Sequence, residues 1–298
     1  MKWDALAKNW YLRRYLKAPV NGSLTHVRRA KVSGYTKRVQ LVALISPDLA
    51  LRQALAQFRK PALGVLIHPV TPTEFSAVAS SLAPLDFRGA LVLDESFHEA
   101  AFRVAQRSSL MAQETSTADT LTVSYGGLIA DYTLGRAVVM ALQNKGWDAR
   151  GARVVVVGAG PVARAVCREV SSLGAAHLTV LASDSPTAER TLGALAASTE
   201  CTARSYRDPL VSSYLLRADL LVRVDPTFEV ATAQVGPHLS VVDFAAEPLS
   251  RLRQQAAGVG ATAIGRRDVQ AYQLALGLEN VLGSRVSAGD FLGVLHSL

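Results

Sequence analysis

A run of four valines that leads into a glycine-rich turn constrains this chain more than any other feature. Val154–Val157 is apolar at every position, which is typical of a parallel strand buried on both faces. The next six residues, 158–163, read Gly-Ala-Gly-Pro-Val-Ala, and a helix-like segment continues to about residue 173. This succession of strand, GxGxxA turn and helix predicts a βαβ unit whose turn binds the diphosphate of a dinucleotide.

The residue types in the turn fit that chemistry. Gly158 permits the tight turn, and Gly160 has no Cβ to block the close approach of a pyrophosphate. Pro161 costs little at the first helical position, because the amide that it lacks has no partner inside a helix. The alternative is a tight turn that binds nothing. The predicted cofactor-binding residues of the turn are Gly158, Ala159, Gly160, Pro161 and Val162.

Two further candidates for cofactor binding, Ser183 and Asp184, stand at the end of the next predicted strand, about 20 residues beyond the turn. An acid at this place accepts hydrogen bonds from the adenosine ribose and repels the 2′-phosphate of NADP. We therefore expect NAD or NADP as the cofactor, with NAD favoured. The alternative role for Asp184 is to cap the helix that follows it.

Strand-like and helix-like segments alternate along the whole chain from residue 39, which predicts an α/β fold with mostly parallel sheets. A length of 298 residues indicates two medium domains or one large one, and an apolar content of 49% excludes global disorder. The predicted strands are residues 39–45, 62–68, 89–94, 120–125, 153–157, 178–181, 220–224, 240–243 and 261–264.

The net charge of +8 is concentrated at the amino-terminal end of the chain. Residues 1–40 hold ten Lys and Arg against one acid, Asp4, whereas the remaining residues are nearly neutral. A basic arm on a neutral body argues against a nucleic-acid-binding protein. Trp3, Leu6 and Trp10 recur at helical spacing, so we expect an amphipathic helix that packs on the body or on a partner subunit. Anion or membrane binding is the alternative.

Several other classes are excluded by what the sequence lacks. No apolar stretch reaches the roughly 18 residues that span a bilayer, and the first residues do not resemble a secretory signal. Cys167 and Cys201 lack CxxC spacing, and the histidines lack the spacing of metal ligands. We expect a cytoplasmic protein with no metal site and no membrane partner.

The chain resembles the shikimate/quinate dehydrogenase family across roughly residues 39–283. The resemblance rests on motifs in the family's order: an AVNT-like strand start, a GxNTDG-like turn, the glycine-rich cofactor turn, an ADL(L/V)-like strand and a Q-x-A-x-A-F-E-x-W-x-G-like helix. These motifs correspond to residues 119–120, 126–135, 153–163, 218–221 and 273–283. The resemblance implies a substrate-type α/β domain over residues 1–132, joined by carboxy-terminal helices at 269–298. It also implies a Rossmann dinucleotide-binding domain over residues 133–268, with the active site in the groove between the two.

The catalytic positions depart from the family's pattern. The family's lysine, which works with an aspartate on the substrate hydroxyl proton, falls on Pro72. The aspartate falls on Leu134, although one inserted residue would put Asp131 there instead. Asp119 replaces the substrate-binding asparagine, and Ala246 replaces a tyrosine.

Three positions resemble the family's substrate-contacting residues, and we predict that they bind substrate in this chain. Gln273 is unchanged from the family, whereas Ser23 and Thr25 resemble its S-x-S pair.

We predict that His68 forms a substitute acid/base pair with Asp119 or Asp131, because imidazole exchanges protons near neutral pH. A structural histidine at position 68 is the alternative.

Removal of a positioned acid/base group costs two to four orders of magnitude in rate. We therefore expect an NAD(P)-binding, shikimate dehydrogenase-like oxidoreductase that is not an efficient shikimate dehydrogenase and acts on another small hydroxy acid. The alternative is a pseudoenzyme that serves as a nucleotide-binding or regulatory module. The aromatic arm favours a homodimer.

Overall fold

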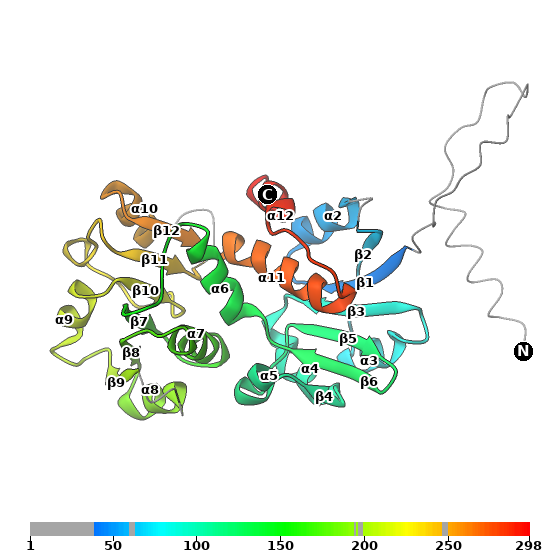
Figure 1. Ribbon diagram of the computed structural model, residues 1–298, viewed down its shortest axis with the longest axis horizontal. Coiled ribbons are helices and arrows are strands. Elements are labelled where there is room, and N and C mark those ends of the chain that lie inside the picture. The colour runs from blue at the N-terminus through cyan, green and yellow to red at the C-terminus, as the bar shows by residue number, and fades with distance from the viewer. Residues whose placement is uncertain (1–38, 60–62, 194, 196–198, 246–249) are drawn as a thin grey trace, which may run out of the picture. The chain divides into compact units, whose positions relative to one another are not determined.

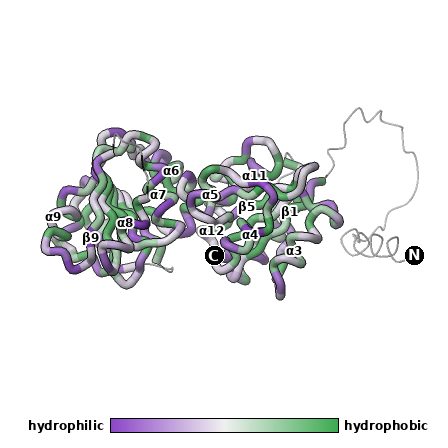
Figure 2. Tube along the Cα trace, turned by 90° about the horizontal axis from the view of Figure 1, so that it is seen from below, coloured by the Kyte–Doolittle hydropathy of each residue, from purple (hydrophilic) through white to green (hydrophobic). Residues whose placement is uncertain are grey.

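A computed structural model describes residues 39–59, 63–193, 195, 199–245 and 250–298 (Figure 1). These residues form two six-stranded sheets with helices packed against them, so the predicted α/β class is confirmed. Strands and helices both contribute buried apolar residues, and Figure 2 shows hydrophobic residues along both. Among the described helices, none combines the length and the apolar character needed to cross a bilayer.

The first sheet has the strand order β2-β1-β3-β5-β6-β4. Its strands are β1 (Gln40–Ile45), β2 (Val65–Pro69), β3 (Phe87–Val92), β4 (Arg107–Ser108), β5 (Thr120–Ser124) and β6 (Gly127–Asp131). Strand β1 pairs in parallel with β2 and β3, and β4 pairs in parallel with β6. The β5–β6 hairpin adds two antiparallel pairs, β3–β5 and β5–β6. Strand β6 was not predicted, because it follows β5 directly after the two-glycine turn.

Helices from both ends of the described chain pack on this sheet. They are α2 (Leu49–Gln57), α3 (Phe75–Ser81), the 3₁₀ turn η1 (Glu95–Phe97), α4 (His98–Val104), α5 (Leu110–Thr115), α11 (Arg266–Leu282) and α12 (Gly289–His296). Leu44 and Leu91 of the strands share a buried core with Leu274 and Leu278 of α11 and Phe291 of α12. The long helix α11 therefore stabilises a sheet whose strands lie more than 130 residues earlier in the sequence.

The second sheet is parallel throughout and has the strand order β12-β11-β10-β7-β8-β9. Its strands are β7 (Arg153–Val157), β8 (His177–Ala182), β9 (Glu200–Ser205), β10 (Leu220–Arg223), β11 (Ser240–Asp243) and β12 (Thr262–Gly265). The chain leaves β7 in one direction for β8 and β9, then returns to the other side of β7 at β10. Ligands of open α/β sheets bind at the carboxyl ends of the strands beside such a reversal.

The helices beside this sheet are α6 (Leu134–Gln143), α7 (Pro161–Ser172), α8 (Ser185–Leu192), α9 (Val211–Leu216) and α10 (Arg251–Gly258). Strand β9 was not predicted, because its sequence, ECTARS, has no apolar run. As the edge strand it is only partly buried, so its residues need not be apolar. By contrast, Val154–Val157 of the central strand β7 are each at most 2% exposed.

A close approach between α6 and α7 depends on a glycine. A Cβ atom at Gly135 would lie 2.5 Å from the carbonyl oxygen of Ala165, a contact that real Cβ atoms do not make. Gly293 of α12 provides the contrast, because a Cβ there meets nothing within 4 Å.

We predict that Gly135→Ala lowers the free energy of unfolding by about 1–3 kcal/mol, the usual cost of overpacking. Gly293→Ala is the matched control and raises it by up to about 1 kcal/mol, because alanine loses less entropy in a helix. Urea unfolding of both variants measures the difference. Equal stability of the two variants would show that α6 and α7 are not packed as described.

Candidate functional site: a nucleotide cradle and an adjoining polar pocket

The two glycines of the turn after β7 meet different surroundings. Gly158 and Gly160 both have positive φ, at 119° and 89°, a conformation that side-chain-bearing residues rarely adopt. A Cβ at Gly158 would lie 2.8 Å from the backbone nitrogen of Asp225, so this glycine lets the turn pack on the loop after β10. A Cβ at Gly160 would meet nothing within 4 Å. The space above Gly160 is therefore open to a ligand.

The start of α7 is built to receive an anion. Gly160 is the N-cap and supplies no side-chain hydrogen bond to the first turn, and Pro161 takes the first helical position as predicted. The first-turn amides of a 12-residue helix thus face the open space with the positive end of the helix dipole. A diphosphate fits this cradle by charge and by hydrogen bonding.

Ser183 and Asp184 follow β8 at the same edge of the sheet, and both are exposed. Asp184 Oδ1 accepts a hydrogen bond from the Thr187 amide at 2.8 Å, and Oδ2 accepts from the Ser183 and Thr187 hydroxyls, each at 2.9 Å. The hydrogen bonds from Thr187 and then from Ser183 hold the pKa of Asp184 below its ordinary value. The carboxylate therefore caps α8 and stays charged beside the cradle.

A buried ion pair fixes the neighbouring strand ends. The Arg223 guanidinium donates two hydrogen bonds to the Asp243 carboxylate, at 2.9 and 2.8 Å, and both side chains are buried. Burial alone would push the pKa of Asp243 upward, but hydrogen bonds from Arg223, the Ser250 hydroxyl and the Ala245 amide bring it below its ordinary value. The pair ties the carboxyl end of β10, next to the cradle, to that of β11.

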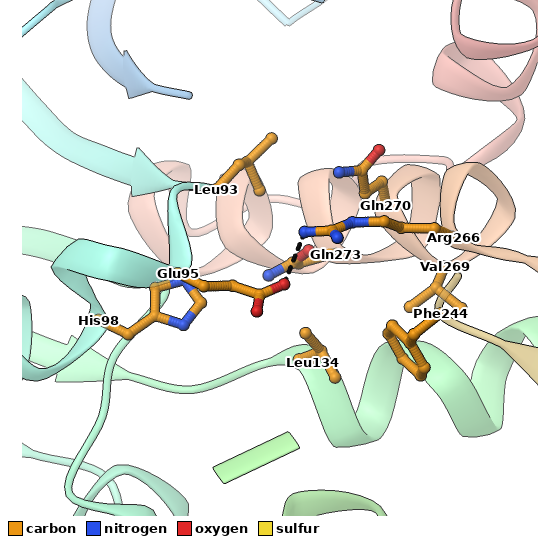
Figure 3. A pocket seen from close by; sticks show the side chains of 9 residues that line it. All are labelled: Leu93, Glu95, His98, Leu134, Phe244, Arg266, Val269, Gln270 and Gln273. Atoms are coloured by element: carbon orange, nitrogen blue, oxygen red, sulfur yellow. Dashed lines mark hydrogen bonds and ion pairs between the residues drawn. The ribbon is translucent and has the colours of Figure 1, made fainter. Parts of the chain in front are cut away.

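A small polar pocket lies where segments from both sheets meet (Figure 3). It is lined by Leu93, Glu95, His98, Leu134, Phe244, Arg266, Val269, Gln270 and Gln273. Its cavity volume is about 10 Å³, the space of about one water molecule. Figure 3 shows the Glu95 side chain extending across the pocket toward Arg266. The Glu95 Oε1 and Arg266 guanidinium nitrogen atoms are 2.6 Å apart.

Behind Gln273 lies a buried carboxylate, Asp119, which is 1% exposed. It accepts hydrogen bonds from the Thr133 amide and hydroxyl, from the Thr120 hydroxyl and from the Gln273 side-chain amide at 2.9 Å. Burial raises the pKa of Asp119; the nearby His98 and the hydrogen bonds from Thr133 and Gln273 oppose that rise without cancelling it. The predicted residues Asp119 and Gln273 are thus brought together.

His68 lies apart from this group. It is on β2, the edge strand, and β1 and β3 separate that strand from β5. At the usual strand spacing this puts His68 roughly 14 Å from the line of β5. Its ring packs toward Phe87, with the ring centroids 6.2 Å apart, and burial lowers its pKa. The structure therefore does not bring His68 beside Asp119.

Asp131 occupies the end of β6, where other groups already use its carboxylate. It accepts hydrogen bonds from the Ser109 hydroxyl, from the Tyr132 amide at 2.8 Å and from the Asn280 side chain at 2.6 Å. These bonds hold β6 against α5 and α11. Asp131 does not line the pocket.

Three predicted positions, Ser23, Thr25 and Ala246, lie outside the described residues. Leu134 lines the pocket with an apolar side chain where the resemblance expects the family's aspartate. None of the lining residues is a lysine. Lys145, the single lysine in the part of the chain that the structure describes, is exposed beyond the end of α6.

Sequence reasoning missed three pocket residues, Glu95, His98 and Arg266. The His98 ring is buried, and its Nε2 lies 2.9 Å from the Val92 carbonyl oxygen. Arg266 comes directly after the carboxyl end of β12, and Glu95 comes three residues after that of β3. A charged residue just past a parallel strand was the available signal, since that end of the strand faces a ligand crevice.

We predict that Asp119→Asn flattens the pH dependence of stability. Because the folded-state pKa is raised, the unfolded chain loses its proton first as pH rises above the ordinary value of 3.8. The free energy of unfolding of the wild-type chain therefore falls on the way to the folded-state pKa, by about 1.4 kcal/mol per unit of raised pKa. The free energy of unfolding of the asparagine variant should show no such decrease as pH rises. Urea unfolding from pH 4 to pH 8 tests it, with exposed Glu99→Gln as the control; parallel profiles for Asp119→Asn and the wild type would contradict the prediction.

Comparisons with known proteins agree with this geometry. Residues 146–235 match a family model for NAD(P)-binding domains. A shikimate dehydrogenase (NADP⁺) from Rhizobium meliloti is 36% identical over 111 residues, which are 36% of this chain and 38% of that protein. The match thus spans less than two-fifths of the length of this curated relative.

Among solved structures, the quinate dehydrogenase from Corynebacterium glutamicum in complex with NAD superposes with a TM-score of 0.76 at 16% identity, over 88% of this chain and 100% of that one. The shikimate 5-dehydrogenase from Listeria monocytogenes in complex with shikimate and NAD gives a TM-score of 0.74 at 17% identity, over 86% of this chain and 96% of that one. At such identities these structures establish the fold.

The fold and the cradle define an NAD(P)-binding α/β protein with two halves, one of which is a Rossmann domain. Curated relatives that match part of the chain, and solved structures with the same fold, are shikimate or quinate dehydrogenases, which confirms the resemblance found in the sequence.

Proposed function

We propose that this chain is an NAD-dependent oxidoreductase that acts on the CH–OH group of a small hydroxy acid other than shikimate. Residues 133–268 carry the cofactor in this proposal, and residues 1–132 with 269–298 carry most of the substrate site. The observation on which it rests most is the open, uncapped start of α7 at the chain reversal of a parallel sheet. A cytoplasmic homodimer stays our prediction for location and assembly.

The choice of NAD over NADP rests on Asp184. Its carboxylate is charged and exposed beside the cradle, where a 2′-phosphate would bring a second negative charge. Asp184 accepts three hydrogen bonds, two from Thr187 and one from Ser183, and a carboxylate has about four acceptor sites, so about one site is left to accept from a ribose hydroxyl.

The bound nicotinamide would accept the hydride from the substrate carbon, and the chain must then take the hydroxyl proton. We assign that proton to Nδ1 of His98, a pocket-lining residue. The partner of Nε2 is the Val92 carbonyl, which only accepts, so Nε2 carries the hydrogen and Nδ1 is the nitrogen left to take up a proton. The Asp119 carboxylate lies close enough to interact with the charged imidazole and would stabilise it.

The family's own acid/base pair does not fit this pocket. Pro72 and Leu134 stand at the positions of its lysine and aspartate, and neither side chain transfers a proton. Shikimate oxidation by the family's route is therefore not what we propose. A nucleotide-binding module without catalysis is the second candidate, and the observation that favours it is the small volume of the pocket.

We predict that NAD raises the melting temperature more than NADP does at equal concentration. Asp184→Asn keeps an oxygen to cap α8 but removes the charge, so it narrows the ratio of the NADP and NAD dissociation constants by about five- to tenfold. Asp148→Asn is the matched control, because Asp148 is also exposed and bound to a near neighbour, Arg150. Thermal shift and calorimetric titration measure both effects. If neither dinucleotide bound, the proposed function would be wrong.

We also predict turnover of a hydroxy acid in a panel that includes shikimate and quinate, followed by nicotinamide absorbance. His98→Gln should lower kcat by two to four orders of magnitude, as is usual for the loss of a positioned base. His238→Gln, at an exposed histidine outside the pocket, should leave kcat unchanged. Cofactor binding without turnover of any panel compound would favour the module instead.

A further inference from the structure

The Glu95–Arg266 ion pair joins the two segments that border the pocket from opposite sides. Glu95 begins the 3₁₀ turn after β3 of the first sheet, and Arg266 begins α11 after β12 of the second. The two residues are 171 positions apart in the sequence, and their charged atoms are 2.6 Å apart. Figure 3 shows their contact in the middle of the pocket, next to the side chain of Gln273.

This contact also explains why the pocket is so small. The Glu95 side chain crosses the space between His98, Leu134 and Gln273, and about one water molecule fits beside it (Figure 3). A substrate that reaches His98 must therefore displace the Glu95 carboxylate. The Arg266 guanidinium holds this Glu95 carboxylate at the place that the carboxylate of a ligand would take.

The ion pair is weak enough for such an exchange. The side chains of Glu95 and Arg266 are 50% and 37% exposed, and the net worth of an exposed ion pair is a factor of about one to five in an equilibrium constant. A carboxylate on a ligand can bind a guanidinium through two parallel hydrogen bonds, which are stronger than a single contact. The pocket amides of Gln270 and Gln273 can donate to the same ligand.

We propose that Arg266 is the group that binds the carboxylate of the ligand, and that Glu95 is a built-in competitor that occupies Arg266 until the ligand arrives. Arg266 is thus the specificity-determining residue for the acid part of a hydroxy acid, so the inference rests on the proposed function and names how that function selects its substrate. Release of Glu95 enlarges the pocket at the same moment as the ligand binds.

A double-mutant cycle tests this role. Dissociation constants of shikimate, quinate and their uncharged methyl esters are measured by calorimetry, with NAD present, for wild type, Glu95→Gln, Arg266→Gln and the double variant. Inorganic phosphate is a further arm, because arginine also binds phosphate. Glu99→Gln and Arg267→Gln are the matched controls, since neither residue lines the pocket. Arg266→Lys replaces Arg266→Gln if the latter does not fold.

We expect Glu95→Gln to tighten carboxylate binding about two- to fivefold, because the competing carboxylate is gone. Arg266→Gln should weaken it at least about tenfold, as befits the loss of a charge-assisted hydrogen bond. The gain from Glu95→Gln should vanish when Arg266 is also replaced, and methyl esters should respond to neither change. A merely structural ion pair would not produce this pattern.

Three results would overturn the inference: carboxylate binding unchanged in Arg266→Gln, a Glu95→Gln gain that persists without Arg266, or tighter binding of phosphate than of either carboxylate. Failure of every carboxylate to bind wild type and Glu95→Gln, while NAD still binds, would also overturn it and leave the cofactor half of the proposed function intact. If NAD and NADP also failed to bind, the proposed function itself would be wrong.

Discussion

One buried carboxylate holds together the segments from which the pocket is made. Asp119 stands before β5, and its hydrogen bonds reach Thr133 at the start of α6 and Gln273 in α11. A buried charge is tolerated only when hydrogen bonds replace its hydration, and four donor groups do so here. Since α6 leads from the first sheet to β7, and α11 returns from β12, this carboxylate fixes both crossings between the sheets.

The nucleotide cradle and the pocket have opposite characters, and each follows from its backbone. The cradle is open because Gly160 has no side chain and α7 has no cap, so its amides can bind a diphosphate. The pocket is closed because Glu95 fills it and is held by Arg266. An enzyme built this way would bind its cofactor to a ready surface and its acid substrate by exchange for a carboxylate of its own.

The sequence predicted the parts of the fold that depend on local pattern. Four valines predicted a central strand, and the glycines after them predicted the turn, because periodicity and backbone freedom are local properties. The site was harder, because its members meet only through tertiary packing. Asp119 and Gln273 were found through the resemblance, whereas His98, Glu95 and Arg266 were missed. His68 has the right chemistry for an acid/base group, but the strand order keeps it away from Asp119. The order of strands in a sheet cannot be predicted from local sequence pattern.

The central claim is that a dinucleotide lies on the turn between β7 and α7, with its reactive end toward the polar pocket. A crystal structure of the NAD complex tests it most directly. The account predicts diphosphate oxygens within hydrogen-bond distance of the first-turn amides of α7, above Gly160, and the nicotinamide within reach of the pocket that His98 lines. A diphosphate bound elsewhere, or a cradle filled by side chains of the protein itself, would contradict it.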